Sequence, residues 1–147
     1  MGVHDFSIKS HSVDGRGPEK PSEQEALRAV ITMLRWAGDD PNREGLVETP
    51  KRVLKAFNEW FSGYNENPVE ILEKTFREVE GYEDWVVLKS IRLESYCEHH
   101  LAPIIGTVRV AYLPDKLVVG ISKLARVVDI FSKRLQIQER LTREIGL

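Results

Sequence analysis

Two runs of strand-forming residues, separated by a short segment, most limit what this sequence can fold into. The runs are "WVVLKSIRL" at 85–93 and "IIGTVRVAYL" at 104–113, and both are rich in β-branched or aromatic residues. From Thr107 to Tyr112 the second run alternates polar or small residues with apolar ones, which predicts one apolar face. We therefore expect two antiparallel strands joined by the segment between the runs.

Helical patterns lie on both sides of these strands. Ser22 and Glu25 form a capping box ahead of apolar residues at helical spacing, and Thr49 followed by Pro50 is typical of a second helix start. After the strands, Ser122 is a candidate cap for a third helix, and a fourth follows at 137–145. The order helix, helix, strand, strand, helix, helix predicts an α+β fold.

Composition limits the class of protein. Residues 1–21 mix Gly, Ser, Pro and charges with few large apolar side chains, so we expect a flexible tail followed by one domain over 22–147. The single cysteine forms no internal disulfide, and no apolar run approaches the roughly 18 residues of a membrane span. We expect a cytoplasmic protein. The net charge of -2 gives no general attraction to nucleic acid or to an anionic membrane.

The segment between the strand runs contains "SYCEHHLAP", with Cys97, His99 and His100. The C-x-x-H spacing of Cys97 and His100 allows a thiolate and an imidazole to bind one zinc ion. A packed cysteine beside two surface histidines explains the same residues. A structural zinc uses four protein ligands and a catalytic zinc three, whereas this cluster offers two obvious ones. His99 beside a ligand is suited to proton transfer near neutral pH.

Basic residues occur in two further places. Lys51, Arg52 and Lys55 lie near the start of the second helix, largely off its apolar face, and a solvated surface explains them simply. Residues 122–147 carry six Lys or Arg against three acidic residues, an excess of +3 that suits an anionic substrate. Within this segment Glu139 and Arg143 have the i,i+4 spacing of an exposed ion pair.

Three long runs resemble the GTP cyclohydrolase I family: "ETPKRVLKAF", "ESYCEHHLAPIIGTVRVAYLP" and "VVGISKLARVVDIFSKRLQIQERLT". The resemblance extends from about Ser22 to the end of the chain. It implies the tunnelling fold, with N-terminal helices followed by an antiparallel sheet packed on two helices, in a ring-shaped homo-oligomer that is a decamer. It also implies hydrolytic opening of the guanine imidazole ring of GTP to 7,8-dihydroneopterin triphosphate and formate, the first step of tetrahydrofolate and pterin biosynthesis.

The resemblance implies a role for particular residues. Cys97 and His100 match zinc ligands, and His99 matches a histidine that transfers protons at the imidazole ring of guanine. Gln138 and Glu139 match the pair that holds the base. The remaining matches meet the triphosphate, in pockets that neighbouring subunits share: Ser122, Lys123, Arg126, Arg52 and Lys55.

Family members continue past the position of Leu147 into strands that carry a third zinc ligand, so we expect an incomplete sheet and zinc site in these 147 residues. A second class of function is therefore a truncated, non-catalytic homologue that acts as an oligomerising scaffold or as a partner of full-length subunits. A third class is a small zinc-dependent nucleic-acid binder. The nearly neutral charge, and the lack of a basic stripe with interleaved aromatic residues, disfavour it.

Overall fold

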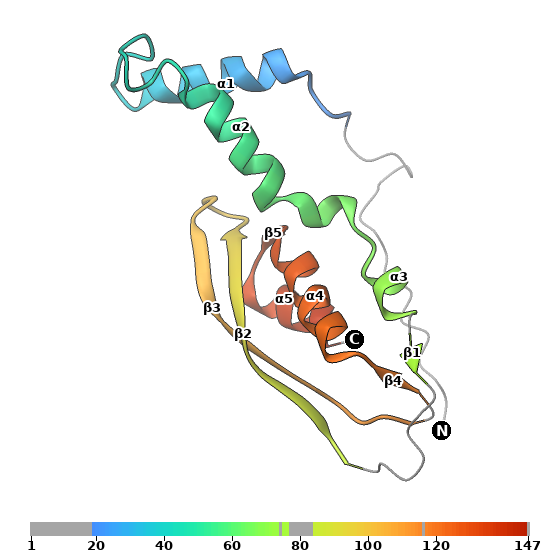
Figure 1. Ribbon diagram of the computed structural model, residues 1–147. Coiled ribbons are helices and arrows are strands. Elements are labelled where there is room, and N and C mark those ends of the chain that lie inside the picture. The colour runs from blue at the N-terminus through green and yellow to red at the C-terminus, as the bar shows by residue number, and fades with distance from the viewer. Residues whose placement is uncertain (1–18, 74, 77–83, 116, 147) are drawn as a thin grey trace. The chain divides into compact units, whose positions relative to one another are not determined.

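The computed structural model describes residues 19–73, 75–76, 84–115 and 117–146 (Figure 1). The chain divides into two compact units, residues 1–51 and 52–147. Helices and two small sheets make up the described structure, which confirms the predicted α+β class. Within the described part of the chain, no helix has the length and apolar character needed to cross a membrane.

The first unit contains helix α1 (Glu23–Trp36), and its start confirms the predicted capping box. The amide of Glu25 donates to Ser22 Oγ at 3.3 Å, and the amide of Ser22 donates to Glu25 Oε2 at 2.9 Å. Both bonds satisfy amide groups that have no partner within a helix start. Helix α2 (Thr49–Trp60) begins at the predicted Thr-Pro pair and continues into the second unit.

The second unit is built on a long antiparallel hairpin of β2 (Val86–Cys97) and β3 (Pro103–Tyr112). The two predicted strands and their antiparallel pairing are confirmed. Strand β2 extends beyond the predicted run. The sequence pattern places Cys97 in the connection between the strands, whereas in the structure it is the last residue of β2. On its other side β2 pairs in parallel with β5 (Leu135–Gln136), which gives the strand order β3-β2-β5.

A β-bulge divides the hairpin into two ladders. Leu88 pairs with Val110 and Ile91 pairs with Val108, so two residues of β2 oppose the single residue Arg109 of β3. One of the two is Ser90, whose φ of 58° lies in the left-handed region. Because of the extra residue, Leu88 and Ile91 are both half-buried, although three positions separate them along the strand.

Two further helices cover one face of the hairpin (Figure 1). Helix α4 (Ile121–Ser132) and helix α5 (Gln138–Ile145) correspond to the predicted third and fourth helices, and β5 lies between them. The short elements before the hairpin are the 3-10 helix η1 (Ser62–Asn65), α3 (Pro68–Leu72) and β1 (Thr75–Phe76). Strand β1 pairs antiparallel with β4 (Val118–Val119), immediately before α4.

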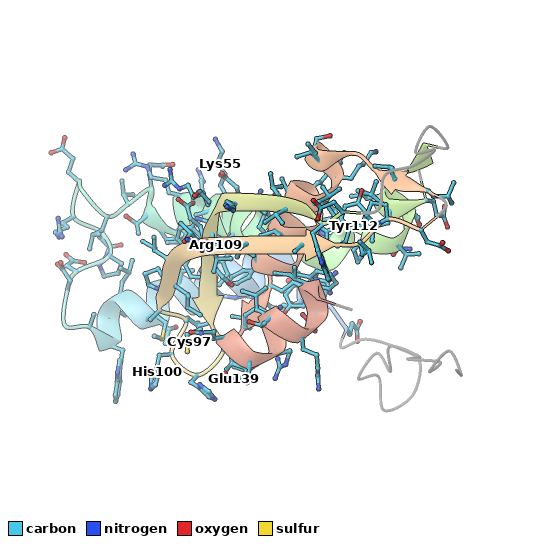
Figure 2. All side chains as sticks on the ribbon, turned by 90° about the horizontal axis from the view of Figure 1, so that it is seen from below. Lys55, Cys97, His100, Arg109, Tyr112 and Glu139 are labelled. Atoms are coloured by element: carbon cyan, nitrogen blue, oxygen red, sulfur yellow. The ribbon has the colours of Figure 1, made fainter. Side chains whose placement is uncertain are left out.

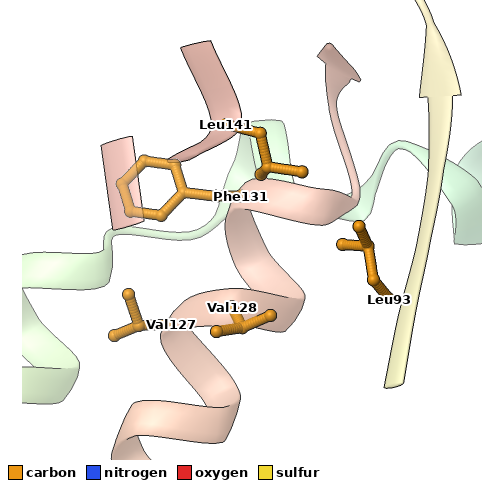
Figure 3. Close-up of a cluster of buried hydrophobic side chains, with 5 residues drawn as sticks. All are labelled: Leu93, Val127, Val128, Phe131 and Leu141. Atoms are coloured by element: carbon orange, nitrogen blue, oxygen red, sulfur yellow. The ribbon is translucent and has the colours of Figure 1, made fainter. Parts of the chain in front are cut away.

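The core lies between the hairpin and α4 (Figure 3). Leu93 of β2 and Leu141 of α5 pack with three residues of α4, namely Val127, Val128 and Phe131. These three residues of α4 are buried, whereas Leu124 of the same helix is only half-buried. Partly buried residues surround the cluster: Ile71, Leu72, Ile91, Val108, Val110 and Ile145.

Candidate functional site

The Cys-His loop, which we define as residues 97–102, is a tight turn held by its own backbone. The amide of Leu101 donates to the carbonyl of Cys97 at 2.8 Å, and the amide of Cys97 donates to the carbonyl of Ala102 at 2.8 Å. Leu101 takes a φ of 56°, a conformation that bulky residues rarely adopt. The turn therefore holds Glu98, His99 and His100 between the end of β2 and the start of β3.

Within this loop the structure brings Cys97 and His99 together. Cys97 Sγ lies 3.7 Å from His99 Nδ1, while the ring centroids of His99 and His100 are 6.3 Å apart. Cys97 is half-buried, and both histidines are exposed. The loop thus offers one sulfur and two imidazoles at or near the surface, with Nδ1 of His99 close to the thiol.

The donor chemistry of the loop fits zinc. A thiolate and an imidazole that bind one tetrahedral zinc ion lie about 3.6 Å apart, which is close to the distance between Cys97 and His99. The residues that the structure describes include no group of three His, Cys, Asp or Glu side chains placed to bind a metal ion. The loop can therefore supply part of a zinc site.

Strand β5 attaches the start of α5 to this loop. Tyr96 pairs with Leu135 and Cys97 with Gln136, and the amide of Glu98 donates to the carbonyl of Gln136 at 3.1 Å. Helix α5 begins two residues later, at Gln138. Figure 2 shows Cys97, His100 and Glu139 at the same end of the hairpin.

The two candidates for base binding are exposed in the first turn of α5. Gln138 and Glu139 both face solvent, and Glu139 lines a hollow of about 340 Å³ together with Ile137, Arg140 and Arg143. The structure thus brings the predicted residues Gln138 and Glu139 to the predicted residues of the loop, although 38 residues or more separate them along the chain.

The basic candidates on α4 lie at the other end of that helix. Ser122 and Lys123 are in its first turn, whereas its last turn leads into β5, and α4 spans about 18 Å. In Figure 1, β4 and β5 mark these two ends. The expectation that Ser122 caps the helix is wrong: Gly120 is the cap residue, without a side-chain bond, and the helix begins at Ile121. Strand β4 ends at Val119, directly before this cap residue.

The remaining basic candidates are also accessible. Arg126 is exposed, and its Nη2 lies 3.8 Å from Glu66 Oε2. Arg52 and Lys55 are exposed on α2, whose last residue, Trp60, packs against Tyr96. One chain therefore presents its candidate site residues in separate places. One group lies at the Cys-His loop, a second lies on α4 near its start, and the two cations of α2 are additional.

Sequence reasoning missed the residues that join the loop to α5. The carboxylate of Glu98 accepts hydrogen bonds from Arg140 Nη1 at 2.5 Å and from Nη2 at 3.2 Å. Gln136 is buried, and its side-chain amide donates to the carbonyl of Phe131 at 2.9 Å and to Glu144 Oε2 at 2.7 Å. No periodic pattern marks a contact between residues 42 positions apart. The only available signal was a charged residue inside the Cys-His motif.

Comparison with known proteins gives a consistent result. A family model described as GTP cyclohydrolase I matches residues 26–147. GTP cyclohydrolase 1 of Maricaulis maris is 64% identical over 127 residues, which is 86% of this chain and 62% of the relative. The same enzyme of Pelagibacter ubique is 62% identical over 87% of this chain and 63% of its own length, and that of Brucella abortus is 60% identical over 87% and 60%. The chain thus spans about three fifths of the length of these curated relatives.

Proposed function

The chain belongs to the GTP cyclohydrolase I family, and from that membership we propose that it acts in the hydrolytic opening of the guanine imidazole ring of GTP. The products of the proposed reaction are 7,8-dihydroneopterin triphosphate and formate, at the entry to tetrahydrofolate and pterin biosynthesis. One observation carries the proposal. The pairing of β5 with the end of β2 brings the Cys-His loop and the first turn of α5 together.

Base recognition is the role proposed for Gln138 and Glu139. Guanine presents two N–H donors side by side, and the two oxygens of one carboxylate can accept both. The carboxylate of Glu139 is exposed and lines a hollow, so an entering base can reach it. The amide of Gln138 offers a donor and an acceptor to the same edge of the base.

Ring opening requires activated water and a proton carrier. Zinc would be held by Cys97 and His100, and when bound it makes water nucleophilic at neutral pH. An imidazole gains and loses protons near neutral pH, so we assign to His99 the proton transfer at the imidazole nitrogen of guanine. The surface position of both histidines supports this assignment because a substrate can reach them.

Triphosphate binding is the role proposed for Ser122, Lys123 and Arg126, with Arg52 and Lys55 on α2. Free amide groups at the start of a helix of 12 residues attract anions, and the cations add to this attraction. Because α4 separates its own start from the Cys-His loop by about 18 Å, we propose that a second copy of the chain completes each pocket. The expected assembly is a homo-oligomer, and the resemblance to the family suggests a decamer.

The proposed function is tested by measuring formate and fluorescent pterin produced from GTP. We would compare the 147-residue chain with a completed chain, in which the C-terminal segment of the Maricaulis maris relative follows Leu147. The completed chain should turn over GTP, and Cys97→Ala should abolish the activity. An inactive completed chain that is folded and loaded with zinc would contradict the proposal, as would full activity of its Cys97→Ala variant.

The second candidate is a non-catalytic scaffold that joins other copies or full-length subunits. Among the described residues, β3 pairs only with β2, so its other edge is open. Beside it lies a mainly apolar hollow of about 510 Å³ between β3 and α5. Such an edge with an apolar face can accept a further strand. A scaffold predicts that the 147-residue chain joins the Maricaulis maris enzyme in sedimentation experiments without adding turnover.

A further inference from the structure

Glu98 and Arg140 form a two-point ion pair next to the candidate site. Arg140 Nη1 lies 2.5 Å from Glu98 Oε2, and Nη2 lies 3.2 Å from Glu98 Oε1. The side chains of Glu98 and Arg140 are 27% and 38% exposed, so solvent screens this pair less than a fully exposed one. Parallel bonds between a guanidinium and a carboxylate fix the angle between the two groups as well as their distance.

The positions of the two residues give the pair its significance. Glu98 lies between Cys97 and His99, and its Oε1 is also 3.9 Å from His99 Nε2. Arg140 directly follows Glu139 on α5. Neighbouring residues on a helix point about 100° apart, so Arg140 can bind the loop while Glu139 stays exposed.

The ion pair is a second attachment between the same two segments. The first is on the backbone, where the amide of Glu98 donates to the carbonyl of Gln136 at 3.1 Å. Together with the pairing of Cys97 and Gln136, this bond holds only the first two residues of the loop, at β5. Arg140 adds a contact from α5, beyond β5, so the loop is held at two separate places.

We propose that Glu98 and Arg140 are positioning residues that hold the Cys-His loop at a fixed distance and angle from Gln138 and Glu139. The inference rests on the proposed function, in which the loop acts on a base that these α5 residues hold. Neither positioning residue needs to touch the substrate. Their effect is on alignment, and a misplacement of about 1 Å in an active site can reduce the rate about a hundredfold.

The kinetic test uses the completed chain with Glu98→Gln, Arg140→Gln and the charge reversal Glu98→Arg with Arg140→Glu. Each single variant should lower kcat for GTP by roughly tenfold to a hundredfold, with a much smaller change in KM, because alignment fails while the base and triphosphate contacts remain. The reversal should recover most of this loss. The matched control is Asp129→Asn, which removes the ion pair of Asp129 with Lys133 on the surface of α4 and should leave kcat unchanged.

The second readout, hydrogen exchange, requires no activity. In the 147-residue chain the amides of Cys97, Glu98 and Leu101 make the bonds that hold the loop. They should exchange faster in Glu98→Gln and in Arg140→Gln, and should be protected again in the reversal. Asp129→Asn should not affect them.

The two readouts separate the possible failures. If the completed wild-type chain makes no pterin, the proposed function fails, and the exchange data alone show whether the pair holds the loop. If the completed wild-type chain turns over GTP but loop exchange and kcat are unchanged in the single variants, the positioning role is wrong. It is also wrong if the single variants lose activity and the reversal does not recover it, because Glu98 would then act directly on the reactants.

Discussion

The indole ring of Trp60 at the end of α2 stacks on the ring of Tyr96, with centroids 4.7 Å apart and an interplanar angle of 28°. Phe61 meets the same phenol ring edge-on, with centroids 5.5 Å apart. Tyr96 directly precedes Cys97, so this aromatic cluster fastens α2 to the strand end that carries the Cys-His loop. Such pairs contribute about 0.5–1.5 kcal/mol beyond the area they bury.

Trp60→Ala should therefore lower the free energy of unfolding by about 2 kcal/mol, less than for a fully buried Trp because the residue is 38% exposed. Urea unfolding followed by circular dichroism measures this change. The control is Trp36→Ala, because Trp36 is 86% exposed and its loss should change stability by less than about 0.5 kcal/mol. Equal effects of the two substitutions would show that the stacking contributes nothing.

Tyr96 should ionise at higher pH than an ordinary tyrosine. Burial raises the pKa of its phenol, and the negative charges of Glu94 and Glu59 raise it further. The folded pKa thus lies above the unfolded value of about 10, so stability from the neutral phenol is fully present below pH ~10 and is lost as pH rises through the folded pKa. In an alkaline titration, the part of the phenolate absorbance that is missing in Tyr96→Phe belongs to Tyr96. It should appear at higher pH than for an ordinary tyrosine, and at lower pH in Glu94→Gln than in the wild type. An unshifted titration of Tyr96 would refute this.

Gly63 should tolerate no side chain. A Cβ atom at this position would lie 2.0 Å from the carbonyl oxygen of Ile130, which is backbone and can move little. Gly63→Ala should therefore destabilise the protein by about 3 kcal/mol or more. Gly106→Ala is the control because the added Cβ meets only a Leu93 methyl group at 3.9 Å. A melting temperature of Gly63→Ala equal to that of the control would contradict the packing described.

Base and triphosphate recognition should respond to different substitutions in the completed chain. Glu139→Gln removes a charged acceptor for the base and should weaken guanosine and GTP alike, by about 1.5–3 kcal/mol. Lys123→Ala should weaken GTP and leave guanosine nearly unchanged, because it removes a positive charge at the start of α4. Calorimetric titration with both ligands measures these effects. If each variant lost both ligands equally, the assigned roles would be wrong.

Zinc should bind weakly to the 147-residue chain, because the loop supplies a thiol and imidazoles from one short turn and a catalytic zinc uses three well-placed ligands. After dialysis, atomic absorption should find less than one ion per chain. Cys97→Ser should remove the rest. Comparing His99→Ala with His100→Ala identifies the partner of the thiolate: the distance in the structure favours His99, and the family resemblance favours His100. A tightly held ion in every chain would contradict this prediction.

Local patterns predicted much of the fold. The capping box at Ser22 and the alternation in 107–112 act through neighbouring residues, so the sequence reveals them directly. The two-residue strands β4 and β5 are too short to show alternation, and they exist because distant strands lie beside them. Helix α4 starts directly after β4 and Gly120, so Ser122 does not cap this helix, although its position in the sequence predicts that it does.

The same limit applies to the site. Its candidate residues follow from motifs and from the family resemblance, but their grouping depends on contacts across the fold. Neither the Arg140–Glu98 pair nor the buried amide of Gln136 follows from any spacing in the sequence. The separation of Lys123 from the loop likewise became apparent only once α4 was seen to run from β4 to β5.

The bulge at Ser90 also determines how the gene can tolerate deletions. The side chains of Val86 and Leu88 share a face with Ile91 only because two residues oppose Arg109. Deleting one codon at 89 or 90 would remove the bulge and place Leu88 two positions before Ile91, so Val86 and Leu88 would keep their inward face by simple alternation. Deleting both codons would make Leu88 the direct neighbour of Ile91, turn Val86 and Leu88 toward solvent and bring exposed Val87 inward. In-frame deletions here should therefore be tolerated according to whether an even or an odd number of residues is lost.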